Sequence, residues 1–131
     1  MEFGATLYVR NSELAAKTYC EAFGMRIGYN VRREDGTYLH AELEKDGCGF
    51  AVSESRDAEA ARAVLDARQP VTSLGLSLES DEALRRAYRV LSEGGRVLRE
   101  LGPLPWSPLS ADLVDRFGVC WYLYVSQHRP D

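Results

Sequence analysis

The sequence predicts an α+β protein built from two tandem βαβββ modules. Three observations support this prediction. Segments that alternate between apolar and polar residues, as strands do, surround two helical segments that carry an apolar stripe. The order strand, helix, three strands in the first half of the chain recurs in the second half. The length of 131 residues fits one domain, in which each module has roughly 65 residues.

The first module begins with a strand at residues 4–9 and continues into a helix. Asn11 or Ser12 provides the N-cap of this helix, which runs to about Phe23. Gly24 ends it, because glycine readily adopts the left-handed conformation of a C-terminal cap. The apolar stripe of the helix consists of residues spaced four apart, namely Ala15, Tyr19 and Phe23.

Three strands follow this helix, at residues 25–33, 37–45 and 48–53. Asp35-Gly36 and Asp46-Gly47 are typical of the tight turns that join neighbouring strands of a hairpin. The middle strand alternates most clearly. One face carries Leu39, Ala41 and Leu43, and the other carries Tyr38, His40, Glu42 and Glu44.

A linker rich in alanine and charged residues separates the modules. Residues 56–68 predict a helix that ends before Pro70. We therefore divide the single domain of residues 1–131 into module one (about 1–55), the linker helix (about 56–69), module two (about 70–126) and a tail (127–131). His128 lies in this tail and is interpreted as a solvated terminal residue.

The second module repeats the plan of the first. A strand at 71–79 leads to a helix that Ser80 or Asp81 caps and that ends at Gly94-Gly95. The apolar face of this helix carries Leu84, Ala87, Tyr88 and Leu91. Strands follow at about 96–101, 108–114 and 117–125, separated by Gly102-Pro103 and by residues 115–118.

A shift of 69 residues superimposes the two modules in sequence. It places Leu7 on Leu76 and Tyr19 on Tyr88, and the capping positions of the two helices coincide. Strand, cap, helix and terminating glycine therefore agree in register, which favours an internal duplication. The nearest alternative fold, a ferredoxin-like pair of split βαβ units, does not have three consecutive strands after each helix.

Composition excludes several classes of function. The net charge of −4 and a pI near 5.2 argue against a nucleic-acid footprint and against a polybasic membrane anchor. The sequence shows no signal-peptide pattern and no apolar run of about 20 residues that would span a bilayer. Three cysteines without a Cys-x-x-Cys pair fit reduced thiols, so we expect a cytoplasmic protein.

Two such modules in about 130 residues resemble the vicinal oxygen chelate superfamily, which includes glyoxalase I, extradiol dioxygenases and bleomycin-resistance proteins. Three segments are similar to its PhnB-like branch: Tyr8-Val9-Arg10-Asn11 with the helix ending Ala22-Phe23-Gly24, His40-Ala41-Glu42-Leu43, and Asp115-Arg116-Phe117-Gly118-Val119-Cys120-Trp121. The resemblance implies that the modules form a curled mixed-sheet cup around a small-molecule ligand, and that the protein is a homodimer.

Members of this superfamily that bind a metal hold it with histidine, glutamine or glutamate side chains. Matched by strand register, their ligand positions fall on Gly4, on Ser73, near Ser53 or Glu54, and on Tyr122. Only Glu54 is a usual metal ligand, and a transition-metal site ordinarily needs at least three protein donors. The resemblance therefore implies the fold but predicts no metal and no cofactor for this chain.

The candidate ligand-binding residues are polar or aromatic side chains on strand faces that the resemblance turns towards the cup, with one tryptophan in a loop at its mouth. They are Tyr8, Tyr38, His40, Glu42, Ser73, Trp106, Cys120, Tyr122 and Tyr124. Each also has a simpler interpretation. The strand residues can face solvent or fill the cup, Trp106 can anchor a dimer interface, and Cys120 can be a buried, inert thiol.

Three functions follow from these residues. The first is metal-free binding of a small organic molecule, aromatic molecules included. The second is an isomerase, lyase or dioxygenase-type enzyme, either metal-dependent or using His40 and Glu42 as an acid–base pair. The third is an interaction module whose cups are filled by its own side chains. Trp121, on the opposite face of the last strand, is predicted to pack in the core against a helix.

Overall fold

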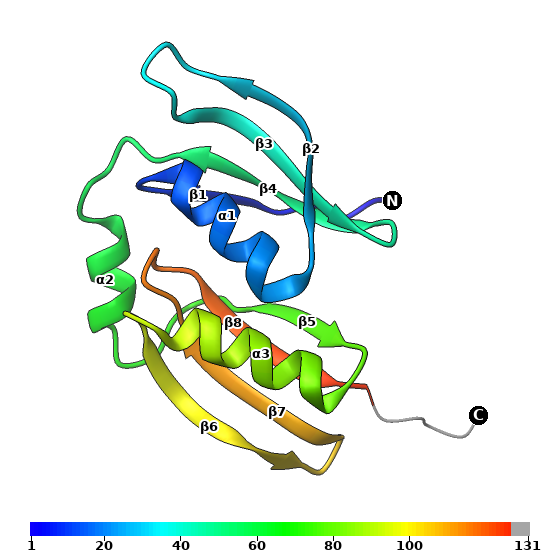
Figure 1. The fold of residues 1–131 in the computed structure, drawn as a ribbon. Helices are drawn as coiled ribbons and strands as arrows, with labels where there is room; N and C mark the ends of the chain where they lie inside the picture. Colours follow the sequence, from blue (N-terminus) through cyan, green and yellow to red (C-terminus); the bar gives the residue numbers. More distant parts are fainter. Residues whose placement is uncertain (127–131) are drawn as a thin grey trace.

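The computed structural model describes residues 1–126, and Figure 1 shows two modules of the same design. The elements are β1 (Thr6–Val9), α1 (Ser12–Phe23), β2 (Arg26–Arg32), β3 (Tyr38–Lys45), β4 (Cys48–Glu54), α2 (Ala60–Asp66), β5 (Leu74–Leu78), α3 (Asp81–Ser92), β6 (Arg96–Leu104), β7 (Ser107–Val114) and β8 (Cys120–Val125). Among these residues, no helix has the length and hydropathy needed to cross a bilayer.

Each module forms one mixed four-stranded sheet, and the two sheets have equivalent strand orders. Sheet A is ordered β1-β4-β3-β2 and sheet B is ordered β5-β8-β7-β6. In both sheets the opening strand pairs in parallel with the last strand, and the other pairs are antiparallel. The predicted α+β fold of two βαβββ modules is therefore confirmed.

The ends of the helices follow the local sequence signals. Asn11 is the N-cap of α1, where its side-chain oxygen accepts a hydrogen bond from the Leu14 amide, and Gly24 is the left-handed C-cap. Ser80 caps α3 in the same way, by accepting from the Ala83 amide. Each side chain satisfies one of the amide groups that a helix leaves unpaired at its start.

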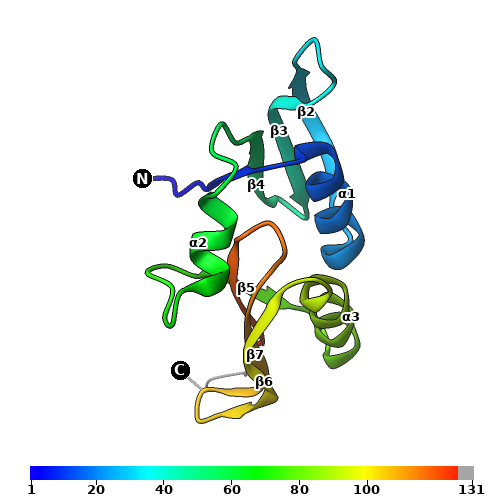
Figure 2. The same ribbon diagram turned by 90° about the vertical axis from the view of Figure 1, so that its left-hand side faces the viewer.

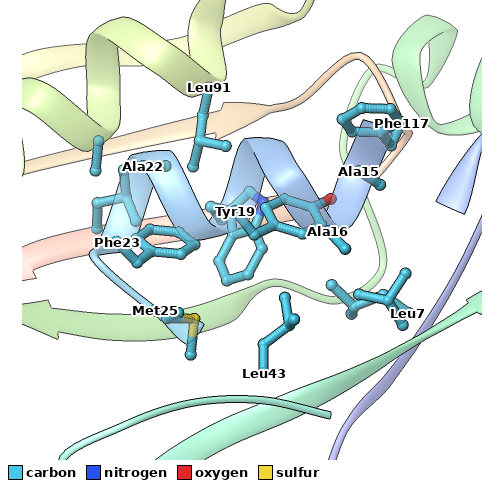
Figure 3. Packing of buried hydrophobic residues seen from close by; sticks show 14 of the residues in the cluster. Leu7, Ala15, Ala16, Tyr19, Ala22, Phe23, Met25, Leu43, Leu91 and Phe117 are labelled. Carbon is cyan, nitrogen blue, oxygen red and sulfur yellow. The ribbon is translucent and has the colours of Figure 1, made fainter. Parts of the chain in front are cut away.

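The core lies where α1 packs against both modules. The aromatic rings of Tyr19 and Phe23 on α1 lie 5.6 and 5.0 Å, centroid to centroid, from the ring of Trp121 on β8. Phe50 of sheet A reaches the same cluster. Figure 3 shows Tyr19, Phe23 and Phe117 among the buried residues around α1. The predicted core position of Trp121 is confirmed, and the helix it packs against belongs to the other module.

Helix α2 lies on the opposite side of the sheets from α1 and α3 (Figure 2). Arg96 at the start of β6 anchors its end by donating hydrogen bonds to the carbonyl oxygens of Leu65 and Ala67. The backbone of α2 also meets Gly118, where an added Cβ would lie 2.6 Å from the Cα atom of Ala61. The linker helix therefore covers one end of the face of sheet B that α3 leaves open.

Several predicted boundaries differ from the structure; β5 begins at Leu74 rather than at residue 71, and β8 begins at Cys120 rather than at residue 117. The linker helix is shorter than the predicted residues 56–68, and β1 begins at Thr6 rather than at residue 4. Gly102-Pro103 does not interrupt a strand but lies inside β6. Strand β6 is at the edge of sheet B and has register shifts along its pairing with β7, so the missing amide hydrogen of Pro103 is tolerated there.

Candidate functional site

Sheet B has one open face, on the side away from α3, and its strands bring polar and aromatic side chains together there. Directly paired residues on neighbouring strands share a face. Asp112 on β7 pairs with Arg99 on β6 and with Tyr122 on β8. Two residues away on the same face, Ser110 on β7 pairs with Tyr124 on β8. We call this surface the module-two face, made up of Gly75, Ser77, Arg99, Ser110, Asp112, Tyr122 and Tyr124.

Aromatic side chains form the centre of the module-two face. The rings of Tyr122 and Tyr124 are stacked, with centroids 4.9 Å apart and planes inclined by 13°. Gly75 lies opposite them on β5, and a Cβ atom there would already touch the Tyr122 ring at 3.6 Å. The indole N–H of Trp106, in the β6–β7 turn, donates a 3.0 Å hydrogen bond to the Tyr122 hydroxyl. Three of the predicted residues therefore lie together.

A polar network lies beside these rings. The Arg99 guanidinium donates through Nε to Asp112 Oδ2 at 2.7 Å and through Nη2 to Ser110 Oγ at 2.8 Å. The Arg99 and Asp112 side chains are each 31% exposed, so the pair is partly desolvated but open to an incoming molecule. Arg99, Ser110 and Asp112 are not among the residues that the sequence indicates as a site. The polar Ser110 and Asp112 within the otherwise apolar strand 108–114 were the available signal.

An open cavity of about 330 Å³ lies next to the polar network. Its lining includes Arg99, Asp112, the predicted residues Ser73 and Cys120, and the linker turn at residues 69–72. A second, larger cavity of about 600 Å³ is also lined by that turn, and Tyr8 and Cys120 line it together with residues of α2. Both volumes are within the usual range of small-molecule sites, about 300–1,000 Å³.

Cys120 is buried at the covered end of sheet B. Burial raises the pKa of its thiol, and the carboxylates of Asp112 and Asp115 raise it further. A nucleophilic cysteine needs the opposite shift, because the thiolate is the reactive species. Cys120 therefore contributes shape to both cavities rather than a reactive group.

The open face of sheet A carries a second group of predicted residues. His40 Nε2 lies 2.9 Å from Glu42 Oε2, and the Tyr29 ring is 6.2 Å from the imidazole. Tyr8 is also on this side of the sheet and is 69% exposed. Within residues 1–126, no hydrogen bond or ring contact joins His40 or Glu42 to the module-two face. Among the predicted residues, only Tyr8 of this sheet shares a cavity with a residue of sheet B, Cys120.

Tyr38 does not share a face with His40 and Glu42, contrary to the expected alternation. The pairing of β2 with β3 shifts between Val31 and Arg32, which leaves Leu39 as an extra residue and turns Tyr38 towards α1. Tyr38 is 3% exposed, its amide donates to the Ser12 hydroxyl, and Arg32 stacks over its ring. The β-bulge is the physical reason for this correction.

The residues at the superfamily's metal-ligand positions do not fit a divalent metal. Gly4 has no side chain, Ser73 offers a neutral hydroxyl, and the Tyr122 hydroxyl already accepts from Trp106. Both carboxylate oxygens of Glu54 already accept hydrogen bonds at the start of α1, from the Ser12 amide at 2.8 Å and from the Asn11 amide at 3.1 Å. Within residues 1–126, no three histidine, cysteine, aspartate or glutamate side chains come together as a metal site would require.

Several known structures share this fold. A PhnB protein from Bacillus cereus, described as a putative 3-demethylubiquinone-9 3-methyltransferase, is 24% identical with a TM-score of 0.76, covering 96% of this chain and all of the other. Protein PA1353 from Pseudomonas aeruginosa is 22% identical with a TM-score of 0.76 over 98% and 99% of the two chains. The fosfomycin resistance protein FosX from Mesorhizobium loti is 14% identical with a TM-score of 0.65 over 97% and 92%.

No functionally curated protein is similar enough in sequence to count as a relative. A family model does match, over residues 4–123, and it spans both modules with their linker. The duplicated βαβββ plan, the paired mixed sheets and this match agree. The chain belongs to the Glyoxalase/Bleomycin resistance protein/Dioxygenase superfamily.

Proposed function

We propose that this protein binds a small, flat organic molecule on the module-two face without a metal ion. The observation that carries the proposal is the stacked pair of Tyr122 and Tyr124, with the Trp106 indole bonded to the Tyr122 hydroxyl. Aromatic side chains offer a large apolar surface with a polar edge, which suits a planar ligand. Tyr122 also occupies a position where metal-binding relatives carry a carboxylate ligand.

The two tryptophans of the chain provide a direct test. Trp106 is on the module-two side and 52% exposed, whereas Trp121 is 1% exposed in the core. We expect planar aromatic probes, such as naphthalene and quinoline derivatives, to shift the indole N–H resonance of Trp106 and to leave that of Trp121 in place. Tyr122→Leu should weaken binding by at least about tenfold, which corresponds to 1.4 kcal/mol.

Tyr88→Leu is the matched control, because Tyr88 lies on α3, on the other side of sheet B from the module-two face and outside the open face of sheet A. It should leave the affinity unchanged. Equal loss in the two variants, or no response of Trp106 to any probe, would count against the proposed site. Metal analysis of protein purified without chelators tests the other half of the proposal: one tightly bound ion per chain would contradict metal-free binding.

A second candidate function is acid–base catalysis by His40 and Glu42. Their side chains are 2.9 Å apart and partly exposed, so Glu42 can orient the imidazole while the other ring nitrogen meets a substrate. This function predicts that His40→Ala abolishes turnover of a small carbonyl substrate while the circular dichroism spectrum stays unchanged. Turnover that survives in His40→Ala would reject it.

We also propose that the protein is a homodimer in which a second copy covers the open face of sheet A. Tyr8, Tyr29 and Leu39 are 69%, 67% and 50% exposed on this module, an unusual number of large side chains left in water. Sedimentation equilibrium should give twice the mass of the 14.7 kDa chain. Leu39→Glu should shift the mass towards that of a monomer, and a wild-type monomer at all concentrations would refute the assembly.

A further inference from the structure

We propose that the Arg99–Asp112 pair makes the module-two face selective for ligands with a neutral carboxamide group over ligands with a carboxylate or an amidinium group. This inference rests on the proposed function, because it specifies the polar end of the flat molecule that Tyr122 and Tyr124 would bind. It assigns a specificity-determining role to two residues on the strands beside the tyrosines.

The hydrogen bonds within the network leave N–H groups of Arg99 and one carboxylate oxygen of Asp112 available to a ligand. Arg99 uses Nε for Asp112 Oδ2 and Nη2 for Ser110 Oγ. Within residues 1–126, Arg99 Nη1 and Asp112 Oδ1 have no hydrogen-bond partner. The two groups belong to residues that pair directly across β6 and β7. The network therefore presents an N–H donor and a carboxylate acceptor on neighbouring strands.

These two groups lie where a ligand can reach them. Arg99 and Asp112 both line the open cavity of about 330 Å³, and about a third of each side chain is exposed. Asp112 also pairs directly with Tyr122 on β8. Side chains of such pairs lie about 4.5–5.5 Å apart at Cβ. A flat body on the Tyr122 ring would therefore have Asp112 as its neighbour on β7, and Asp112 holds Arg99.

The charge in this cavity is balanced. Apart from Arg99 and Asp112, the residues that line it are Gln69, Pro70, Val71, Thr72, Ser73, Leu98 and Cys120, which have no ionised side chain at neutral pH. A carboxylate would gain from Arg99 but would meet the Asp112 carboxylate, and an amidinium would meet Arg99. A carboxamide has neither conflict, because its oxygen accepts from Nη1 and its N–H donates to Oδ1.

The size of the effect follows from the cost of an unmade hydrogen bond. Leaving one partly buried polar group unsatisfied costs about 1–3 kcal/mol. A charged ligand that breaks the Arg99–Asp112 pair, or that fails to match one of its two groups, should therefore bind about 5- to 150-fold more weakly than a carboxamide with the same ring.

Benzamide, benzoate and benzamidine test the selectivity, because they share the same benzene ring and differ only in the polar group. Each is titrated into the wild-type protein while the indole N–H resonances are followed, with Trp106 as the reporter and buried Trp121 as the internal control. We expect benzamide to bind at least about fivefold more tightly than either charged probe. Benzoate or benzamidine binding as tightly as benzamide would overturn the inference.

Two variants that each remove one charge should reverse the preference. Asp112→Asn removes the negative charge and leaves Arg99 unbalanced, so benzoate should become the preferred probe. Arg99→Gln leaves Asp112 unbalanced, so benzamidine should be preferred. A purely structural role predicts equal weakening for all three probes, which would refute the inference. If either variant does not fold, the other still gives the decisive ranking.

The outcomes distinguish this inference from the proposed function. If the probes shift the Trp106 resonance but benzamide is not preferred, the carboxamide assignment is wrong and the proposed aromatic site is still supported. Probes that leave Trp106 unmoved at every concentration would remove both proposals.

Discussion

The Tyr19 hydroxyl of module one donates a 2.7 Å hydrogen bond to the Asp115 carboxylate of module two. The same carboxylate accepts from the Trp121 indole at 2.8 Å and from the amides of Phe117 and Val119. Burial raises the pKa of Asp115, and these four donors oppose that shift. One buried carboxylate therefore fixes the β7–β8 loop and joins it to α1.

Tyr19→Phe should destabilise the fold by about 1–3 kcal/mol, because it leaves a buried carboxylate with one donor fewer. Urea unfolding measures this free energy. Tyr88→Phe is the control at the duplicated position on α3, since the Tyr88 hydroxyl has no hydrogen bond to residues 1–126. It should change stability by no more than about 0.5 kcal/mol. Equal effects of the two substitutions would show that the Asp115 bond contributes nothing.

Glu54→Gln should make the stability less dependent on pH. Burial raises the pKa of Glu54, but the hydrogen bonds from Ser12 and Asn11 and the positive charge of Arg10 together outweigh this, and the folded-state pKa is lowered. A lowered folded pKa means that the carboxylate stabilises the protein above the ordinary pKa of glutamate. This contribution is lost as the pH falls through the folded-state value.

We therefore expect Glu54→Gln to lower the free energy of unfolding by about 1 kcal/mol near neutral pH, a typical value for a helix-capping interaction. The difference from wild type should disappear in urea titrations repeated below the folded-state pKa. Glu21→Gln is the control, because Glu21 is exposed on α1 and has no ion pair within residues 1–126. A difference that persists in acid would contradict the capping role.

Gly118→Ala should destabilise the protein more than Gly36→Ala. Both glycines have a positive φ, +87° and +90°, so both substitutions incur the left-handed penalty of about 1–2 kcal/mol. Only at Gly118 would the new Cβ meet backbone, 2.6 Å from the Cα of Ala61, whereas Gly36 has nothing within 4 Å. Displacing α2 should add about 1–3 kcal/mol.

Thermal unfolding of the two glycine variants measures this difference, and hydrogen exchange in α2 shows where it arises. Faster exchange of the α2 amides is expected in Gly118→Ala alone. Equal losses of stability, with α2 protected in both, would mean that the contact with Ala61 does not hold the linker helix in place.

Cys48 should react with Ellman's reagent much faster than Cys120. Cys48 is the first residue of β4 and is exposed. Cys120, in contrast, is 8% exposed, and burial raises the pKa of its thiol. The rate depends on access and on the thiolate fraction, and both are low for Cys120. In Cys48→Ala, the reaction of Cys120 should become fast only in denaturant. Rapid modification of native Cys120 would identify an activated thiol.

The local sequence was sufficient for the elements and their order. Helix α1 begins after its N-cap Asn11 and ends at its C-cap Gly24. Asp46-Gly47 forms the β3–β4 turn, with both residues at positive φ. These features depend on conformations of single residues and on hydrogen bonds between near neighbours. The alternation of the last strand also placed Trp121 in the core and Tyr122 and Tyr124 together on the other face.

The candidate site was predicted only in part, because some of its features depend on pairing between strands. Tyr38 left the expected face through a β-bulge, which simple alternation within one strand does not reveal. Arg99 is opposite Asp112 only because of the register shifts in β6. His128, in the predicted tail, lies outside the described residues.

The sequence by itself determined the duplicated βαβββ plan, since hydrophobic periodicity, caps and turns are local properties that recur in both halves. The tertiary structure decided how the two modules meet and which polar groups are used. It showed that Glu54 caps α1 and that Tyr19 reaches Asp115, 96 residues away. Such partners depend on how the chain folds back on itself. The physical reason is that a buried carboxylate needs hydrogen-bond donors, and tertiary packing decides which donors lie close enough.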